Sequence, residues 1–336
     1  MKDWWIMRGD GEQRTDWTLP DPPSWRAFAD RGEHDDRGAS FLIDDDTLDV
    51  VNMALLLRRP LLVTGEPGTG KSTLAFAIAH ELGLKPVLYW SINSRSTLHE
   101  GLYGYDAIGR LQETGIQQAA RGEAATEEAT ARETAGEAAA PDIGAFITLG
   151  PLGTALLPSA RPRVLLVDEI DKGDIDLPND LLNIFEEGSY PIPELVRLAT
   201  RQRDVEVGTA DDGPAGGGRA VIVGGRVRCD AFPIVVLTSN GERDFPPAFL
   251  RRCVQLDLPQ PNADKLGRIV TAHLGPEAKA KAADLVKQFL QHRERSVLAT
   301  DQLLNAVYLL AAGSGARPSP DEVVAAVFRA LGEPGA

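Results

Sequence analysis

One short stretch of the chain has the residue types and spacing of a phosphate-binding loop. Residues 65–72 read GEPGTGKS and satisfy the pattern G-x-x-x-x-G-K-[ST] between an apolar run of strand length and a helical run. Glycines in this pattern let backbone N–H groups wrap phosphate oxygens, and the positive end of the following helix points at them. Lys71 would neutralise the β- and γ-phosphates, and the Ser72 hydroxyl would bind Mg²⁺. The residues expected to hold the nucleotide are Gly65, Glu66, Pro67, Gly68, Thr69, Gly70, Lys71, Ser72 and Thr73.

A second stretch supplies the acids that such a loop needs. Residues 164–169 read VLLVDE, an apolar strand that ends in two adjacent carboxylates. Asp168 is expected to face Mg²⁺, while Glu169 would act as the general base that orients an attacking water. Together with Lys71, these residues predict that the chain binds ATP and Mg²⁺ and hydrolyses ATP to ADP and phosphate.

The elements around these motifs predict an α/β fold. An acidic start and helical spacing of valine and leucine predict a helix over 46–57, and a second helix is expected over 72–82. Apolar runs of strand length, separated by helical or loop segments, are residues 61–63, 87–90, 164–167 and 234–237. Such continuous apolar strands are typical of a parallel sheet that helices cover on both faces.

Composition divides the chain into three parts. Residues 1–40 are rich in tryptophan, charged residues, proline and glycine without periodicity, which predicts an irregular arm. Residues 41–260 would form the nucleotide-binding core. Residues 261–336 turn to Ala, Leu, Val and Lys with helical spacing, which predicts a separate helical domain. Its helices are expected to break at Gly275-Pro276, at Ala299-Thr300 and between 314 and 320.

Two segments interrupt the core. Residues 119–141 are almost entirely Ala, Glu, Thr, Gly and Arg and are expected to form a mobile or marginally helical insert. Residues 205–228 carry a glycine-rich centre between two valine-rich flanks, which predicts a hairpin insert with a flexible tip.

Charge and cysteine content exclude several classes of protein. The formal net charge is −14 and the pI about 4.9, so no general attraction to nucleic acid or to anionic lipid is expected. The two cysteines, Cys229 and Cys253, have neither disulfide nor zinc-site spacing. No run of eighteen apolar residues and no secretory leader is visible, which predicts a cytoplasmic protein without a membrane span.

The order of motifs over about residues 40–330 resembles the AAA+ superfamily. After the phosphate loop and the acidic strand end come a strand that ends in Thr238-Ser239-Asn240, the sequence Phe249-Leu250-Arg251-Arg252, and helices. The resemblance implies an AAA+ P-loop NTPase core, a parallel sheet sandwiched by helices, with a small C-terminal all-helical lid. Within the superfamily, residues 105–109 and 150–152 and the insertion between them resemble the MoxR-like branch. Residues 185–195 resemble the helix and turn that lead into that family's hairpin.

The resemblance also implies roles for later residues. Asn240 is similar to the polar sensor beside the γ-phosphate and the attacking water. Arg251 and Arg252 resemble the arginine finger that reaches a neighbouring subunit's site. Arg252 is favoured, but the family usually has an aromatic residue where Cys253 follows, so the choice between the two stays open.

The lid departs from the family pattern at one point. Where the branch often carries a nucleotide-touching arginine, residues 299–304 offer Asp301 and Gln302. Either another residue such as Arg295 serves instead, or the lid senses nucleotide weakly.

By the resemblance, the working form is a homo-oligomeric ring, a hexamer as in the family. It would remodel or activate protein clients, among them proteins with a von Willebrand factor A domain. One alternative is a nucleic-acid-associated AAA+ motor with Arg226 and Arg228 lining a pore, although the acidic composition opposes it. The other is an ATP-gated oligomeric switch or scaffold with little turnover.

Overall fold

The computed structural model describes most of the chain between residues 38 and 311. The described residues are 38–124, 142–211, 217–293 and 299–311, with four isolated positions at 13, 22, 23 and 322. The expected N-terminal arm therefore lies almost entirely outside the described residues, as do the tip of the expected hairpin, the break expected between 314 and 320, and Arg295. None of the helices in the described part is long and apolar enough to cross a membrane.

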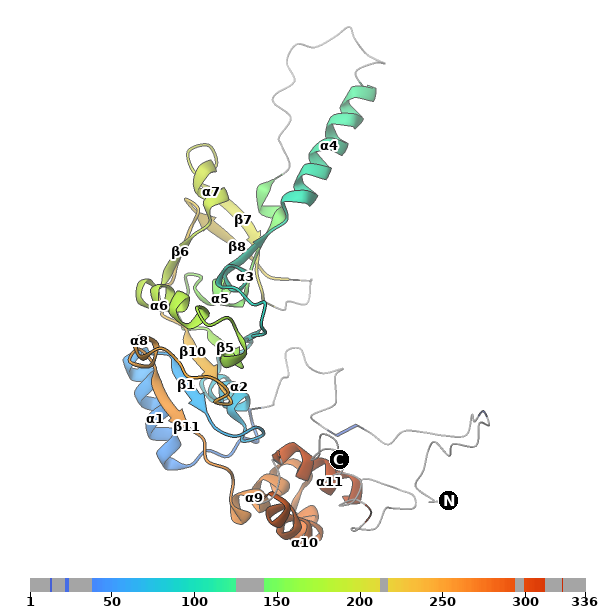
Figure 1. The fold of residues 1–336 in the computed structure, drawn as a ribbon. Coiled ribbons are helices and arrows are strands. Elements are labelled where there is room, and N and C mark those ends of the chain that lie inside the picture. Colours follow the sequence, from blue (N-terminus) through green and yellow to red (C-terminus); the bar gives the residue numbers. More distant parts are fainter. Residues whose placement is uncertain are drawn as a thin grey trace.

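A five-stranded parallel sheet forms the centre of the molecule (Figure 1). Its strands are β1 (Leu61–Thr64), β2 (Val87–Ser91), β5 (Val164–Asp168), β10 (Ile234–Thr238) and β11 (Val254–Asp257), in the order β11-β1-β10-β5-β2. All neighbouring pairs are parallel, and the four predicted strands are confirmed. The edge strand β11 was not predicted, because its four residues alternate between apolar and polar instead of forming a continuous apolar run.

Helices cover both faces of this sheet, which confirms the predicted fold class. On one face lie α1 (Asp45–Leu57) and α2 (Lys71–Leu82), and on the other lie α5 (Pro151–Ala155), α6 (Leu177–Glu187) and the short α8 (Pro247–Leu250). Successive side chains of a strand point to opposite faces, so Leu166 joins the cluster under α1 and α2 while Leu165 joins the other. Both leucines are fully buried.

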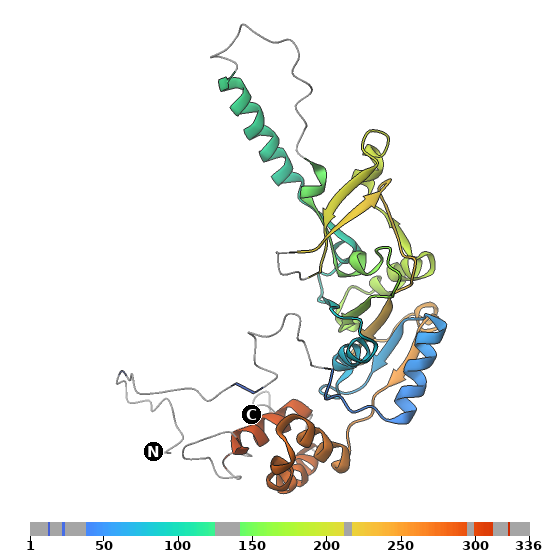
Figure 2. The ribbon, with the colours of Figure 1, turned by 180° about the vertical axis from the view of Figure 1, so that it is seen from behind.

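A second sheet lies at the end of the core away from the C-terminal helices (Figure 2). Its strands are β3 (Tyr103–Tyr105), β4 (Ile147–Leu149), β6 (Ser189–Pro191), β7 (Asp204–Gly208), β8 (Arg219–Val223) and β9 (Arg226–Arg228), in the order β3-β4-β7-β8-β9-β6. The antiparallel pair β7–β8 confirms the predicted hairpin. The other four strands of this sheet, β3, β4, β6 and β9, were not predicted. Each has three residues, too few to show a period of two.

The remaining short elements lie in the segments between these strands and helices. They are α3 (Leu98–Leu102), α7 (Pro193–Leu198) and the 3₁₀ turns η2 (Ile143–Phe146) and η3 (Ile170–Lys172). From the second sheet, α4 (Ala107–Ala124) extends away from the core (Figure 1). The first six residues of the expected insert, 119–124, therefore continue a helix, and 125–141 lie outside the described residues.

Among the residues that the structure describes, three helices follow the core, α9 (Ala263–Leu274), α10 (Pro276–Arg293) and α11 (Thr300–Ala311). They bury a hydrophobic cluster of their own, in which Leu266, Phe289 and Leu303 are fully inaccessible. The breaks predicted at Gly275-Pro276 and Ala299-Thr300 are confirmed. The helices thus form a separate packing unit beside the parallel sheet.

Candidate nucleotide-binding site

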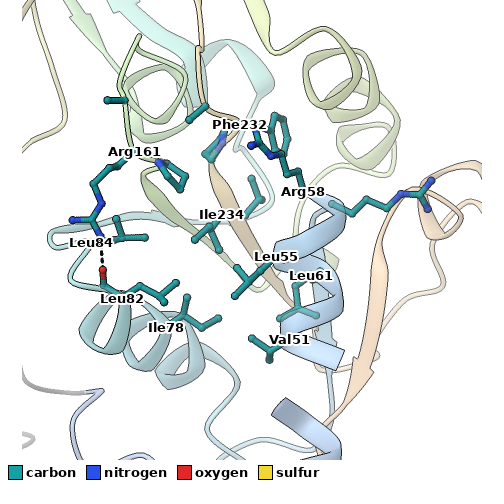
Figure 3. A pocket seen from close by; sticks show the side chains of 17 residues that line it. Val51, Leu55, Arg58, Leu61, Ile78, Leu82, Leu84, Arg161, Phe232 and Ile234 are labelled. Atoms are coloured by element: carbon teal, nitrogen blue, oxygen red, sulfur yellow. Dashed lines mark hydrogen bonds between the residues drawn. The ribbon is translucent and has the colours of Figure 1, made fainter. Parts of the chain in front are cut away.

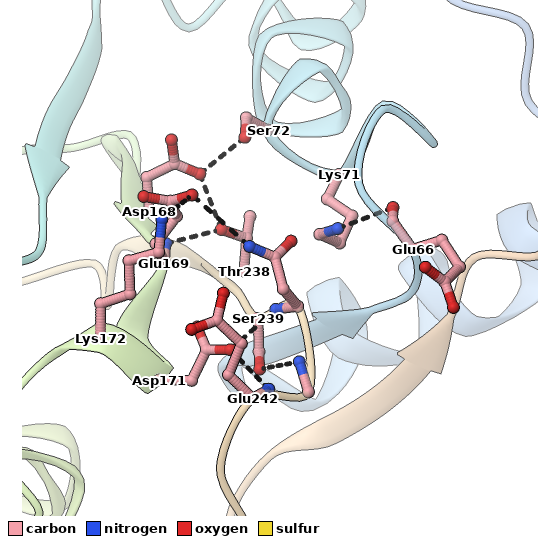
Figure 4. A network of polar contacts seen from close by, with 12 residues as sticks. Glu66, Lys71, Ser72, Asp168, Glu169, Asp171, Lys172, Thr238, Ser239 and Glu242 are labelled. Atoms are coloured by element: carbon pink, nitrogen blue, oxygen red, sulfur yellow. Dashed lines mark hydrogen bonds and ion pairs between the residues drawn. The ribbon is translucent and has the colours of Figure 1, made fainter. Parts of the chain in front are cut away.

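The polar residues of the two motifs meet because parallel strands end at the same edge of a sheet. β10 lies between β1 and β5, and the register pairs Val63 with Thr238 and Leu237 with Val167. The phosphate loop follows β1, Asp168 ends β5, and Asn240 comes two residues after β10. Figure 4 shows these side chains gathered at that edge.

The loop from Gly65 to Gly70 has a backbone that only glycine adopts easily at three points. Gly65, Gly68 and Gly70 have φ values of 140°, 77° and 93°. None of the three leaves room for a side chain, since a Cβ atom would lie 2.6 Å from the Leu258 carbonyl oxygen on Gly65, 2.5 Å from the Ala299 Cβ atom on Gly68 and 2.5 Å from the Phe41 ring on Gly70. The glycines of the motif therefore fix the loop's shape. Gly70 is also the N-cap of α2 and contributes no side-chain hydrogen bond there.

Lys71 begins α2 and turns back over the loop. Its side chain is almost fully buried, and Nζ donates to the carbonyl oxygens of Gly65 at 2.6 Å and of Glu66 at 2.9 Å. Burial lowers the pKa of this ammonium, while the negative charge of Asp171, followed by that of Asp168, acts in the opposite direction. An incoming phosphate would give the buried cation a charged partner in place of carbonyl dipoles.

Asp168 is the centre of the polar network. Its Oδ1 accepts hydrogen bonds from Ser72 Oγ at 2.6 Å and from Thr238 Oγ1 at 2.7 Å, and its Oδ2 accepts one from the Tyr89 hydroxyl at 3.0 Å. One hydroxyl and one carboxylate at this spacing fit Mg²⁺, which binds one or two protein oxygens and completes its shell with phosphate and water. Sequence reasoning had predicted Ser72 and Asp168 but missed Tyr89 and Thr238, whose residue types are ordinary in strands.

Glu169 has an unusual backbone. Its φ is 60° and its ψ 49°, and apart from Arg58 no other non-glycine residue in the described ranges has a positive φ. Side chains with a Cβ atom disfavour this left-handed region by about 1–2 kcal/mol, and such strain collects at functional sites. The Glu169 Oε1 atom pairs with Lys172 Nζ at 2.7 Å and accepts from Asn240 Nδ2 at 3.5 Å. The ion pair raises the pKa of Lys172.

Asp171 is a further residue that sequence reasoning missed. It is 3% exposed, and its Oδ2 accepts from the backbone N–H groups of Asn240 at 2.9 Å and Glu242 at 3.1 Å. Its Oδ1 is buried without a hydrogen-bond partner within the described part of the chain. Asp171 therefore fixes the turn that carries Asn240, and nothing in its local sequence distinguishes it from an exposed loop acid.

The two candidate finger residues lie where the strands of the sheet begin, opposite to the end that carries the phosphate loop. Arg251 and Arg252 precede β11, whose first residue, Val254, pairs with Leu61 at the start of β1. The phosphate loop begins after the four residues of β1, about 13 Å further along the strand direction.

Neither arginine joins the Asp168 network. The Arg252 guanidinium pairs with Glu186 of α6 and donates to the Ala248 carbonyl oxygen at 3.3 Å. The Arg251 carbonyl oxygen accepts from Arg59 at 3.1 Å. Cys253, which follows, is buried, and burial raises the pKa of its thiol to about 12.

The C-terminal helices reach the phosphate loop at one point. A Cβ atom on Gly68 would lie 2.5 Å from the Ala299 Cβ atom, just before α11. Gln302 accepts at 3.1 Å from the Ala299 N–H, so it caps the start of α11, and Asp301 is exposed. Lys265 of α9 pairs with Asp44 at 2.5 Å, which ties the helical unit to the segment before α1.

Comparison with known proteins agrees with this geometry. The family model of the AAA domain, dynein-related subfamily, matches residues 60–253, more than half of the chain and all of the motifs from the phosphate loop to Arg252. No curated protein matches the chain. Strand order, phosphate loop and family match together show that the chain belongs to the dynein-related subfamily of AAA domains, and so to the AAA+ ATPases.

Proposed function

We propose that this AAA+ protein hydrolyses ATP with Mg²⁺ in a ring of identical subunits and uses the cycle to remodel or activate protein partners, as a MoxR-like ATPase. The observation that carries the proposal is the separation of Arg251 and Arg252 from the chain's own phosphate loop. They stand where β11 begins, and the loop stands where β1 ends. A finger at that position serves a neighbouring subunit's site, not its own.

The residues of one chain would then supply most of the chemistry. Gly65 to Thr73 would cradle the phosphates, with Lys71 paired to the β- and γ-phosphates. Bound through Ser72 and Asp168, Mg²⁺ would neutralise phosphate charge. Glu169 would accept the proton of the attacking water as its oxygen bonds to the γ-phosphorus and the bond to ADP breaks. Asn240 lies near enough to Glu169 to orient the same water.

The neighbouring chain would complete the site. Arg252, or Arg251 beside it, would stabilise charge on the γ-phosphoryl group as the bond to ADP lengthens. The ion pair between Arg252 and Glu186 holds the guanidinium at the surface, because both side chains are about half exposed. An assembly, with six subunits as the family resemblance suggests, would therefore be needed for turnover.

The position of the insert supports the MoxR-like assignment. The segments that carry the resemblance, 105–109 and 150–152, adjoin β3 and β4, whose antiparallel pairing brings Tyr105 and Ile147 together, one before the insert in the sequence and one after it. Packing requires the glycine at position 150, where a Cβ atom would meet backbone, whereas at Gly109 it would meet only the Asp106 side chain. A Cβ atom on Gly150 would lie 2.4 Å from the Glu100 carbonyl oxygen, and one on Gly109 2.2 Å from Asp106 Oδ2. The helix α4, whose last residues begin the insert, extends away from the core, and we propose that the insert contacts the protein client.

The test is steady-state ATPase turnover measured together with the mass of the assembly. Wild-type protein would turn over ATP only above the concentration at which it assembles. Glu169→Gln would bind ATP and fail to hydrolyse it, and Arg252→Ala or Arg251→Ala would lose turnover while binding ATP. Arg201→Ala, an exposed arginine after α7, is the matched control and would keep full activity.

Three other outcomes would contradict the proposal. If a monomer hydrolysed ATP and neither Arg251→Ala nor Arg252→Ala lowered the rate, each chain would have a complete site of its own. Tight ATP binding and assembly without turnover would favour an ATP-gated switch or scaffold. Turnover that rises only with DNA or RNA would favour a nucleic-acid motor, for which Arg226 and Arg228, exposed on the same side of β9, are the residues to test.

A further inference from the structure

A cavity of about 390 Å³ lies at the edge of the parallel sheet where its strands begin (Figure 3). It is enclosed by α1, α2, the first residues of β1 and β10, and the loops before β5 and β10. Its volume is within the usual range of small-molecule sites. The nucleotide site is at the opposite ends of the same strands, so the cavity is separate from it.

The walls of the cavity are apolar. Figure 3 shows side chains of both helices and both strands pointing into it. The main wall residues are Val51, Leu55, Leu61, Ile78, Leu82 and Ile234. Such a space suits the hydrocarbon part of a ligand.

All charged residues that line the cavity are arginines. They are Arg58, Arg59 and Arg161, each exposed to solvent, and no carboxylate lines it. This is notable in a chain whose net charge is −14. An anionic group at the mouth of the cavity would therefore meet only positive charge.

Two of these guanidinium groups are already held in position. Arg161 donates to the Leu82 carbonyl oxygen at 2.6 Å, and Arg59 donates to the Arg251 carbonyl oxygen at 3.1 Å. A guanidinium has five N–H donors, so each keeps donors for an anion. The entropy cost of ordering them on binding would be reduced accordingly.

The third arginine has a strained backbone. Arg58 is the C-cap of α1 with φ 52° and ψ 41°, a conformation in which helices usually end with glycine or asparagine. In the described ranges only Glu169 shares a positive φ among non-glycine residues. The N–H groups of Arg58 and Arg59 donate to the carbonyl oxygens of Leu55 and Ala54, so this conformation ends α1 and fixes where the Arg58 side chain leaves the backbone.

We propose that this cavity binds an amphiphilic anion, with an apolar chain inside and a carboxylate or phosphate head on the arginines at the mouth. The site needs neither bound nucleotide nor ATP turnover, so it goes beyond the proposed function. A fork of N–H donors binds either head group in the same bidentate way.

Isothermal titration of the full-length protein with four ten-carbon probes tests how the charge of the ligand's head group contributes beyond its hydrocarbon chain. Decanoate and decyl phosphate are expected to bind at one site, at least about tenfold more tightly than decanol or decyltrimethylammonium, because each charged hydrogen bond is worth roughly that factor. The stronger of the two anions would identify the head group. Equal affinity for all four probes, no binding, or displacement by ADP would overturn the proposal.

Two variants and a control locate the site. Arg58→Gly removes the guanidinium and suits the left-handed backbone, so a misfolded protein is not expected; it should weaken decanoate binding by about tenfold. Leu55→Trp should fill the cavity and remove binding of both anions. Arg201→Ala should bind as wild type. If Arg58→Gly binds decanoate like the wild type, the proposal fails whatever Leu55→Trp does.

Discussion

The two edges of the parallel sheet carry opposite chemistry. Where the strands end, three acids and several hydroxyl groups are linked through Asp168 and the turn at Asn240, and Lys71 lies over the phosphate loop. Where the strands begin, arginines gather after α1, before β5 and before β11. One edge is built to hold a nucleotide, and the other is built to present guanidinium groups. On the proposed function, a complete catalytic site forms only where these two edges of neighbouring subunits meet.

Each edge also holds one strained residue. Glu169 and Arg58 both have left-handed backbones, one beside the nucleotide site and one beside the cavity. In each case a charged side chain occupies a conformation that glycine would adopt at lower cost. The comparison can therefore be tested in two ways. Variants of the two edges can be combined in one assembly, and each strained residue can be replaced on its own.

The largest expected effect comes from mixing variants of opposite edges. Glu169→Gln and Arg252→Ala should each lower turnover by about 10³-fold or more. Co-assembled in equal amounts, they should regain activity, because about a quarter of the sites would combine an intact nucleotide edge with an intact arginine. The measurement is ATPase rate against mixing ratio.

The matched control mixes two variants of the same edge. Lys71→Ala with Glu169→Gln should regain nothing, since no interface then has an intact nucleotide edge. Recovery in this control, or none in the first mixture, would break the comparison between edges.

The next largest effect is expected at Asp171. Asp171→Ala would leave the backbone N–H groups of Asn240 and Glu242 without their acceptor, which should cost about 2–4 kcal/mol of unfolding free energy and most of the ATPase activity. Asp174→Ala, at an exposed acid in the same loop whose side chain accepts from Asp176 N–H, should cost less than about 1 kcal/mol. Urea denaturation of both variants measures the two costs. Equal losses of unfolding free energy would show that Asp171 does not fix the turn at Asn240.

A smaller effect is expected at Tyr89. Tyr89→Phe removes the hydrogen bond to Asp168 Oδ2 and leaves the ring in place, so the Mg²⁺ concentration for half-maximal turnover should rise about threefold to tenfold. The affinity for ATP without Mg²⁺ should not change. If Tyr89→Phe weakened ATP binding without Mg²⁺ as much as it raised the Mg²⁺ requirement, Tyr89 would have a structural role instead.

The smallest effect is expected when each of the two strained residues is replaced by glycine. Arg58→Gly and Glu169→Gly should each change unfolding free energy by only about 0.5–1 kcal/mol in the stabilising direction, because relief of strain is offset by the entropy of glycine. Only Glu169→Gly should abolish hydrolysis. Thermal unfolding with ATPase assays checks both, and a destabilised Arg58→Gly would mean that the arginine is needed for packing.

The sequence by itself determined the nucleotide edge. The phosphate loop is contiguous, and its glycines are required by local backbone angles, so Gly65, Gly68, Gly70 and Lys71 could be assigned without any long-range contact. Four parallel strands were equally readable, because each is a continuous apolar run, and β1, β5 and β10 are buried on both faces. Their parallel arrangement is enough to bring Asp168, Glu169 and Asn240 to one edge.

Only the tertiary structure decided the rest. Tyr89, Thr238 and Asp171 serve the site through pairings between strands and turns about 70 or more residues apart, which no local pattern records. The second sheet has strands too short to show a period, and β11 pairs with a strand 193 residues away. The separation of the arginines from the phosphate loop likewise follows from the register of β1 with β11. Register and long-range pairing are set by packing of the whole chain, whereas a loop's backbone angles are set by its own residues.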